Sequence, residues 1–413
     1  MEAHRTSAAW PGILCAKTYV MLRTTESDPR KLTPRMNSAR LLSLALSVVF
    51  GAAALSAADV LDTFKPGALW PDDQGVHINA HGGGILLHEG VYYWYGEHKI
   101  GGEIGNTAQV GVHVYSSTDL YNWKDRGIAF RVSDDPNSEY TKGCGLERPK
   151  VIYNEKTRKF VMWFHLEFKG RGFTAAHTAL AVSDRPEGPF AYMASFRPNK
   201  GIWPVNVTEA DKNPQLPEPH AGRLANAVLG QYLRRDYEVG QMSRDMTLFV
   251  DDDGTGYLIT SAEENATIHI HQLTDDYLGF SGKWARALVG DSNEAPAVFK
   301  RGGKYYMLSS GTTGWRPNPG RSAVADSMLG TWTRLGNPCR GTPEQIATTF
   351  ESQSTHVLPA PGKPGAFIYM GDRWRPSDAI DGRYIWLPIE WDNGKPILRW
   401  RDSWKLSDLK TAP

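Results

Sequence analysis

The chain has almost no net charge and few cysteines. Its 413 residues carry a formal net charge of +1, and charged residues make up 22% of them. Without an excess of one sign, the composition favours neither nucleic acid nor an anionic membrane as a partner. Of the three cysteines, Cys15 lies near the N-terminus, which leaves Cys144 and Cys339 for the main body. The sequence leaves open whether these two are bridged or whether Cys144 is a small buried residue. No histidine motif accompanies a cysteine, so we expect no cysteine nucleophile.

A run of apolar residues near the N-terminus is too short to cross a membrane. Residues 36–58 contain a basic residue, an apolar stretch and small residues at 56 and 58, which is typical of a signal peptide. Residues 1–35 are polar and unpatterned, which indicates a mis-assigned or non-native extension. We therefore expect residues 59–413 to be exported, to the periplasm or the medium.

A repeating unit organises these remaining residues. Aromatic-rich segments that read as the first strand of each unit are followed by a second strand and, in four units, by a short turn motif. These expected first strands are residues 91–95, 159–164, 256–260, 304–308 and 366–370. A period of roughly 50–65 residues with several strands per unit is typical of a propeller. We therefore predict an all-β fold, a five-bladed β-propeller that fills residues 59–413. A proline-rich stretch at about 196–240 interrupts the repeat, and we expect a loop that shapes the substrate entrance.

Three acidic residues lie where β-rich segments of different units begin: Glu147, Asp245 and Glu294. A propeller brings such points together at one end of its axis. Hydrolysis of a glycosidic bond needs a protonated carboxyl group on one side and an activated water or a carboxylate on the other. A single acid at a strand edge is most often structural, but three at equivalent places indicate glycoside chemistry.

Several weaker signals leave more than one interpretation. The chain has 14 Trp and 17 Tyr, which serve either as stacking platforms for sugar rings or as propeller core. Trp315, Trp374 and Trp386 are candidates for stacking. Residues 251–254 resemble the start of a calcium loop, but a hairpin turn fits better. The alternating His269 and His271 are expected on a solvated strand face, since no third metal ligand is apparent.

Five motifs resemble glycoside hydrolase family 43, in particular its exo-β-1,3-galactanase branch. They are His81-Gly-Gly-Gly-Ile-Leu, Tyr92-Tyr-Trp-Tyr-Gly-Glu97, Glu147-Arg-Pro-Lys-Val-Ile-Tyr-Asn154, Ser243-Arg-Asp-Met-Thr-Leu-Phe-Val-Asp-Asp-Asp-Gly254 and Glu294-Ala-Pro-Ala-Val-Phe299. The resemblance covers about residues 75–410. It implies a five-bladed propeller and an inverting mechanism.

The resemblance also implies roles for individual residues. Glu294 matches the general acid, and Asp245 matches the partner that tunes its pKa. The general-base Asp that most of the family carries in the first blade is missing, since Gly82 and Gly83 stand there. In the galactanase branch, the positions of Glu147 and Gln353 are implicated in handling the water instead. An amide is a poor base, so we expect Glu147 to accept the proton and Gln353 to position water.

The terminal sugar would be held by a second group of residues. By the same resemblance these are Glu97, Asn265 and Thr312. Phe173 stands where the branch tends to carry a Tyr, which removes one hydrogen bond to sugar and puts galactan specificity in doubt. His81, beside three glycines, either lines the sugar pocket or supports the first blade.

The sequence thus predicts an exported inverting glycosidase that removes terminal β-1,3-linked galactose from galactan-type polysaccharide. An α-L-arabinofuranosidase or related pentosidase is the alternative among enzymes. A non-catalytic sugar-binding propeller is the alternative of another class, motivated by the missing first-blade Asp. We expect no metal or cofactor, no nucleic-acid partner, no membrane span in the mature chain, and a monomer.

Overall fold

The computed structural model describes residues 60–214 and 222–411. Within them, the main strands form five antiparallel sheets, each a meander in chain order. The first two sheets comprise β1 His81–His88, β2 Val91–His98, β3 Gly111–Ser117 and β4 Lys124–Arg131, then β5 Gly145–Asn154, β6 Lys159–Glu167, β7 His177–Ser183 and β8 Ala191–Phe196. The next two comprise β9 Met246–Val250, β10 Gly256–Ala262, β11 Thr267–Leu273 and β12 Phe280–Ala287, then β13 Glu294–Arg301, β14 Lys304–Ser310, β15 Arg321–Ala325 and β16 Thr333–Gly336. The fifth comprises β18 Gln353–Pro359, β19 Phe367–Arg373, β20 Arg383–Asp392 and β21 Lys395–Arg399, with the short β17 Cys339–Arg340 parallel to β21.

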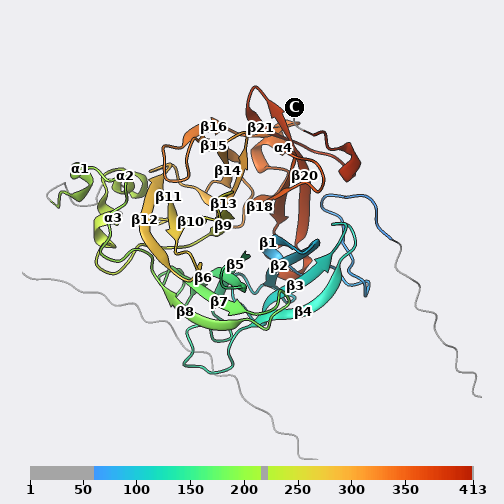
Figure 1. Ribbon diagram of the computed structural model, residues 1–413, viewed down its shortest axis with the longest axis horizontal. Coiled ribbons are helices and arrows are strands. Elements are labelled where there is room, and N and C mark those ends of the chain that lie inside the picture. Colours follow the sequence, from blue (N-terminus) through green and yellow to red (C-terminus); the bar gives the residue numbers. More distant parts are fainter. Residues whose placement is uncertain (1–59, 215–221, 412–413) are drawn as a thin grey trace, which may run out of the picture. The chain divides into compact units, whose positions relative to one another are not determined.

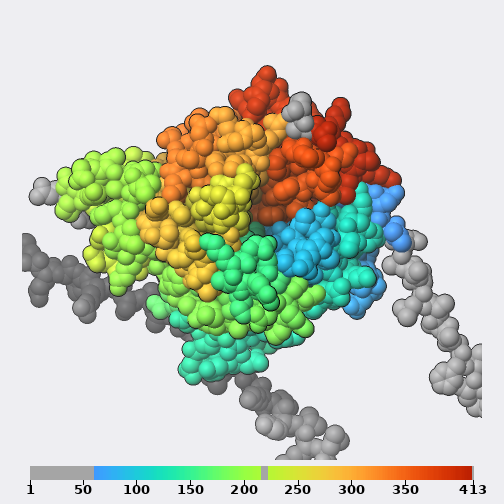
Figure 2. Space-filling view, viewed as in Figure 1, coloured from blue at the N-terminus to red at the C-terminus, as the bar shows by residue number. Residues whose placement is uncertain are grey.

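The five sheets are the blades of a propeller. Their first strands contact one another in a closed ring, in the order β1, β5, β9, β13, β18 and back to β1, and Figure 1 shows these strands at the centre. One hydrophobic cluster fills each gap between neighbouring blades. Figure 2 shows the blades packed around a hollow at the centre of the face in view. The predicted all-β, five-bladed propeller is confirmed.

The aromatic-rich segments that mark the repeat are the second strands of the blades, β2, β6, β10, β14 and β19, not the first. The true first strands line the crowded axis and are less conspicuous in sequence. In β1, for example, a Cβ on Gly83 would collide with the carbonyl oxygen of Tyr95 on β2. Small residues are required there, so the hydrophobic pattern of β1 is weak.

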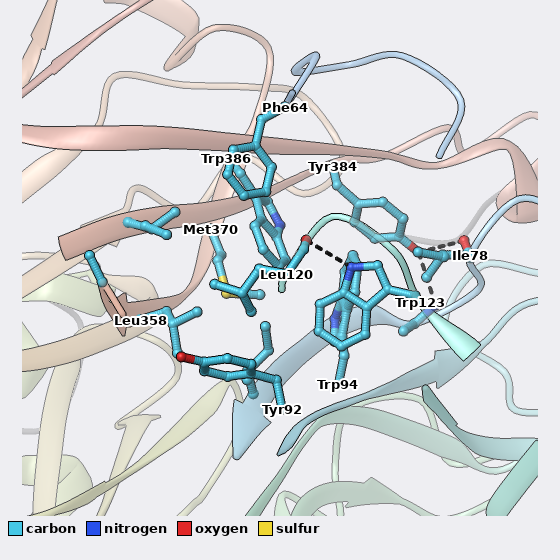
Figure 3. Close-up of a cluster of buried hydrophobic side chains, with 14 of the residues drawn as sticks. Phe64, Ile78, Tyr92, Trp94, Leu120, Trp123, Leu358, Met370, Tyr384 and Trp386 are labelled. Atoms are coloured by element: carbon cyan, nitrogen blue, oxygen red, sulfur yellow. Dashed lines mark hydrogen bonds between the residues drawn. The ribbon is translucent and has the colours of Figure 1, made fainter. Parts of the chain in front are cut away.

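Aromatic side chains close the ring between the first and last blades. Phe64 and Trp404 exchange two backbone hydrogen bonds of 2.9 and 3.1 Å, and their rings lie 4.3 Å apart. Figure 3 shows Phe64 against Trp386, with Trp94 and Tyr384 in the same cluster. Trp386 is 1% exposed, so it belongs to this core and is not a stacking platform.

The interruption of the repeat lies between β8 and β9. Its described part contains three short helices: α1 Glu209–Lys212, α2 Arg223–Val228 and α3 Gln231–Arg235. They stand beside β12 at the outer edge of the third blade (Figure 1), where Trp284 donates a hydrogen bond to the carbonyl of Ile202. The remaining helical segments in the described part of the chain are α4 Pro343–Thr348 and the 3-10 turns η1 Ala379–Asp381 and η2 Leu406–Asp408.

Other sequence expectations meet mixed outcomes. Within the described residues Cys144 and Cys339 are both buried and free. The turn at 251–254 joins β9 to β10 as a hairpin. The expectation for His269 and His271 is wrong: both are fully buried, His269 against Glu263 and His271 against Asn199.

The expected N-terminal extension and signal peptide lie outside the described residues. No helix within residues 60–214 and 222–411 is long and apolar enough to span a membrane.

Candidate active site

The four predicted catalytic side chains meet at one end of the propeller axis. Glu147, Glu294 and Gln353 lie among the first residues of β5, β13 and β18, and Asp245 directly precedes β9. Arg148 joins three of these strand starts, because its guanidinium donates to both Asp245 and Gln353. All four side chains line one cavity of about 340 Å³.

Bulges at the strand starts orient the two glutamates. The register of β5 shifts between residues 147 and 150, and that of β13 shifts between residues 294 and 297. The residue after each glutamate is left-handed, with φ of 57° at Arg148 and 53° at Ala295. A bulge bends a strand and re-aims its side chains, and such strain is common at active sites.

Glu294 has the environment of a general acid. Burial is the main cause that raises the pKa of Glu294 to about 7, and the neighbouring Asp245 carboxylate adds to it. Arg148 and a 2.6 Å hydrogen bond from the Asn265 amide act in the opposite direction. A carboxyl group with a pKa near 7 is still protonated in part of the population at neutral pH, so it has a proton to give to a leaving oxygen.

Two donors hold the side chain of Asp245 beside this acid. Its Oδ2 accepts hydrogen bonds from the Arg148 guanidinium at 3.0 Å and from the backbone N–H of Ala295 at 3.1 Å. Arg148 is itself buried, and carboxylates around it, Asp245 first among them, keep its pKa raised in spite of its burial. The pair is therefore charge-balanced, and it fixes the distance between the β5, β9 and β13 strand starts.

Glu147 is linked to a buried chain of hydrogen bonds. Its Oε2 lies 2.8 Å from His165 Nδ1, while Nε2 of the same ring lies 2.9 Å from Glu167 Oε1. Each carboxylate needs a hydrogen from the ring, so both ring nitrogens carry one and His165 is an imidazolium. Burial alone would lower the pKa of His165, but the two carboxylates outweigh it and raise the pKa to about 9.

This chain leaves one oxygen of Glu147 without a hydrogen-bond partner among the described residues. That oxygen, Oε1, is buried. The other end of the chain is anchored, since Glu167 accepts the backbone N–H groups of Ala175 and Ala176 at 2.8 and 3.0 Å. Glu147 is thus a rigidly held carboxylate with one lone acceptor in a cavity wall.

The oxygen of the Gln353 amide is fully engaged. It accepts from two groups that can only donate, the Arg148 guanidinium and the Trp374 indole. The amide nitrogen donates to the Ser310 hydroxyl at 2.9 Å. Both donors stabilise a carbonyl oxygen with its partial negative charge, so they favour the ordinary amide over the tautomer that a basic Gln would need.

Glu97 forms the wall on the first-blade side. Its carboxylate bonds the Lys99 ammonium at 2.6 Å and accepts the backbone N–H of Arg148 at 2.9 Å. A Cβ on Gly82 would collide with Glu97 Oε1. This close approach explains why this chain has glycine at the position where most of the family carries the first-blade Asp.

Of the other predicted sugar-binding residues, two line the cavity and two do not. Phe173 and Asn265 line the cavity together with Trp315 and Trp374, and Phe173 is 46% exposed. Thr312 and His81 are not among the described residues that line it.

Both exceptions have a local cause. Thr312 lies outside the cavity lining, where its hydroxyl forms hydrogen bonds with Ser292 and Arg223. His81 is 0% exposed and stacks on Tyr384. His81 is therefore a support of the first blade in this structure, which corrects the prediction that it lines the sugar pocket.

Sequence reasoning did not assign roles to Arg148, His165 or Arg244, which also line the cavity. Arg148 stood in a quoted motif, directly after a candidate base. His165 and Glu167 alternate on β6 beside β5, which could have signalled a contact with Glu147.

The ligand atoms of Glu147, His165 and Asp245 lie within 4.8 Å of one another, a spacing that a metal site could have. A metal there would compete with Arg148, which already balances Asp245, and with the two hydrogen bonds of His165. These residues fit a proton-transfer site better than a metal centre.

Comparison with known proteins agrees with this chemistry. The model for glycosyl hydrolases family 43 matches residues 228–396. A family 43 β-1,3-galactosidase solved with galactodeoxynojirimycin is 50% identical, and the match covers 83% of this chain and all of that one, with a TM-score of 0.79. An exo-β-1,3-galactanase from Clostridium thermocellum is 36% identical over 83% of this chain and 66% of that one, with a TM-score of 0.66.

A further similar structure is the exo-β-1,3-galactanase from Phanerochaete chrysosporium with β-1,3-galactotriose. It is 30% identical, with 85% of this chain and 71% of that chain covered and a TM-score of 0.68. No match was found among curated proteins.

Proposed function

Because this chain belongs to family 43 of the glycosyl hydrolases, we propose that it removes terminal β-1,3-linked galactose from galactan-type polysaccharide with inversion. The enzyme class and the five-bladed fold are those of its relatives. The observation that carries the proposal is the cavity in which a buried Glu294, raised in pKa, and a rigidly held Glu147 both stand. The similar proteins act on β-1,3-linked galactose.

In the proposed mechanism Glu294 protonates the oxygen of the leaving sugar. Glu147 accepts a proton from a water that attacks the anomeric carbon from the opposite face; its Oε1 has no hydrogen-bond partner among the described residues. Inverting enzymes place two such carboxyl groups roughly 6.5–9.5 Å apart, so that a water fits between them and the sugar. Asp245 keeps Glu294 protonated to a higher pH, since a second negative charge nearby disfavours ionisation.

Gln353 positions the water in this scheme and takes no proton. Its oxygen is occupied by two donors, so it has no basic lone pair to offer. Its nitrogen donates one hydrogen to Ser310 and carries a second that would bond the water. Glu97 and Asn265 would hold hydroxyl groups of the terminal sugar. Phe173 and Trp315 are partly exposed in the cavity wall, and they would contact apolar faces of the sugar or its neighbour.

The proposal extends to the location of the enzyme. The N-terminal pattern supports export after removal of residues 36–58, with Met36 as the true start and the mature enzyme acting as a monomer. N-terminal sequencing and size-exclusion chromatography of native protein test both points. A mature protein that begins before residue 36 would contradict the proposed leader.

Product analysis is the decisive experiment. The mature chain is incubated with β-1,3-galactan and, separately, with an arabinofuranosyl glycoside, and the anomer first released is identified by NMR. Early α-galactose from the β-linked substrate is the expected result. Pentose release alone would move the enzyme to the arabinofuranosidase activity, and galactose binding without any product would indicate a sugar-binding propeller.

A further inference from the structure

A strained turn lies beside the proposed general acid. It joins β10 to β11, and its residues Glu263, Glu264 and Asn265 have φ of 52°, 57° and 60°. Left-handed backbone costs each non-glycine residue free energy, so three in a row persist only where surrounding contacts enforce them. The last of the three donates the 2.6 Å hydrogen bond to Glu294.

The helical insert between β8 and β9 supplies contacts that hold this turn from outside. Arg235 on α3 forms an ion pair of 2.8 Å with Glu264. Arg223 on α2 donates to the backbone carbonyl of the same residue at 2.7 Å. The second oxygen of Glu264 pairs with Arg244 at 3.1 Å, and Arg244 lines the cavity next to Asp245.

A buried ion pair ties the other end of the turn to the same insert. Glu263 is 0% exposed and bonds the guanidinium of Arg286 on β12 through both carboxylate oxygens at 2.7 Å. Arg286 also donates to the backbone carbonyl of Ala227 on α2 at 2.6 Å. A charge pair removed from water fixes geometry strongly, because breaking it leaves an uncompensated buried charge.

We propose that the insert is a clamp for the general acid, with Arg235 and Arg223 as positioning residues. They hold the 263–265 turn so that the Asn265 amide reaches Glu294. None of the described insert residues lines the cavity, so the clamp acts through the turn and not by contact with substrate. This inference rests on the proposed function, since it assumes that Glu294 is the acid.

The clamp has a defined effect on the ionisation of Glu294. The charged groups that face Glu294 are Asp245, Arg148, Glu147 and, from β15, Arg321. Among the neutral neighbours, the Asn265 amide lowers the pKa of Glu294 by donating to its carboxylate. Loosening the turn removes that donor, so the pKa of Glu294 rises and the alkaline limb of the activity profile moves to higher pH.

The test compares Arg235→Met and Glu264→Gln with Arg399→Met. Arg399 is a control of similar exposure: it lies on β21 and pairs with Glu390 with side-chain exposures of 56% and 34%, against 45% and 32% for the pair of Arg235 and Glu264. Arg235 also pairs with the buried Asp236 at 2.8 Å, so Glu264→Gln, which leaves that pair intact, isolates the contact with the turn. We expect the first two variants to lower kcat roughly three- to tenfold with a smaller change in KM. Their alkaline limb moves to higher pH, and the control keeps the wild-type profile.

A merely structural role is excluded by repeating the measurement in an Asn265→Ala background. If the clamp acts through Asn265, Arg235→Met adds little to the loss already caused by Asn265→Ala, because the two changes remove one interaction. Equal effects of Arg235→Met in both backgrounds would overturn the proposal, as would an unchanged pH profile. Melting curves confirm that each variant is folded.

Hydrogen exchange separates this proposal from the proposed function. Exchange in a peptide that spans the 263–265 turn is expected to accelerate in Arg235→Met and not in Arg399→Met, whatever the substrate. A wild-type protein without activity on galactan but with this exchange pattern would refute the galactanase assignment and leave the clamp standing. Unchanged exchange in Arg235→Met would refute the clamp.

Discussion

Replacing Asp245 by Asn should move the alkaline limb of activity to lower pH. The acid must be protonated to act, and the wild-type limb is expected near pH 7 because the pKa of Glu294 is about 7. Removing the Asp245 charge removes one cause of that increase. The isosteric amide keeps an oxygen for the two donors that now face Oδ2, Arg148 and the Ala295 N–H. The site geometry is therefore expected to persist.

The size of the shift follows from Coulomb's law. Unit charges about 4 Å apart interact by about 4 kcal/mol at an effective dielectric constant near 20. Arg148 pairs with Asp245 and cancels most of its field, so we take about 1–2 kcal/mol, or about one pH unit. Without its anionic partner, Arg148 also lowers the pKa of Glu294, in the same direction. Burial, the largest cause, is unchanged, so part of the increase remains.

The assay is kcat/KM for β-1,3-galactobiose from pH 4 to 9. Asp251→Asn is the control, because Asp251 lies just beyond the other end of the β9 strand, where it pairs with Lys300, and its charge is outside the cavity. An alkaline limb that stays in place or moves to higher pH in Asp245→Asn would refute the assignment of Asp245 as the residue that tunes the acid. A shift of the same size in Asp251→Asn would show that the alkaline limb responds to the net charge of the protein and not to Asp245 in particular.

The remaining predictions concern the acid, the base and the ring closure. Glu294→Gln should abolish turnover while calorimetry still detects galactose binding; unchanged hydrolysis would contradict the assignment of the acid. Glu147→Gln should slow turnover by at least about 100-fold, as loss of a general base does, and near-normal rates would transfer that role to Gln353 or elsewhere. Phe64→Ala should lower the unfolding free energy in urea by roughly 3–5 kcal/mol, since Phe64 is 2% exposed; Val60→Ala, at 83% exposure, should change it by less than about 0.5 kcal/mol.

The fold was predictable because its signal is repeated. Each blade places an aromatic, β-branched strand second from the axis, and five copies of that pattern exceed what chance similarity would produce. The innermost strands were harder to recognise, because each packs at the axis against the first strands of both neighbouring blades. There the sequence must use glycine, as at Gly83, or small and polar residues in place of a hydrophobic alternation.

The candidate site was predictable in part. Motif resemblance identified Glu294, Asp245, Glu147 and Gln353, and all four line one cavity. It left the role of His81 open, because whether a histidine faces a cavity or a neighbouring Tyr depends on packing from a blade some 300 residues away. Tertiary packing also hid the burial of His269 and His271, because the insert and β12 cover both side chains.

By itself, the sequence determined the number of blades and the acids at the strand starts, since these are local patterns read along the chain. Only the tertiary structure decided which groups share protons and charge. The imidazolium of His165 exists because two carboxylates from different strands flank it, and Gln353 stays an amide because Arg148 and Trp374 converge on its oxygen. The burial of these groups and the distances between them set their protonation states, and both arise only when the five blades close into a ring.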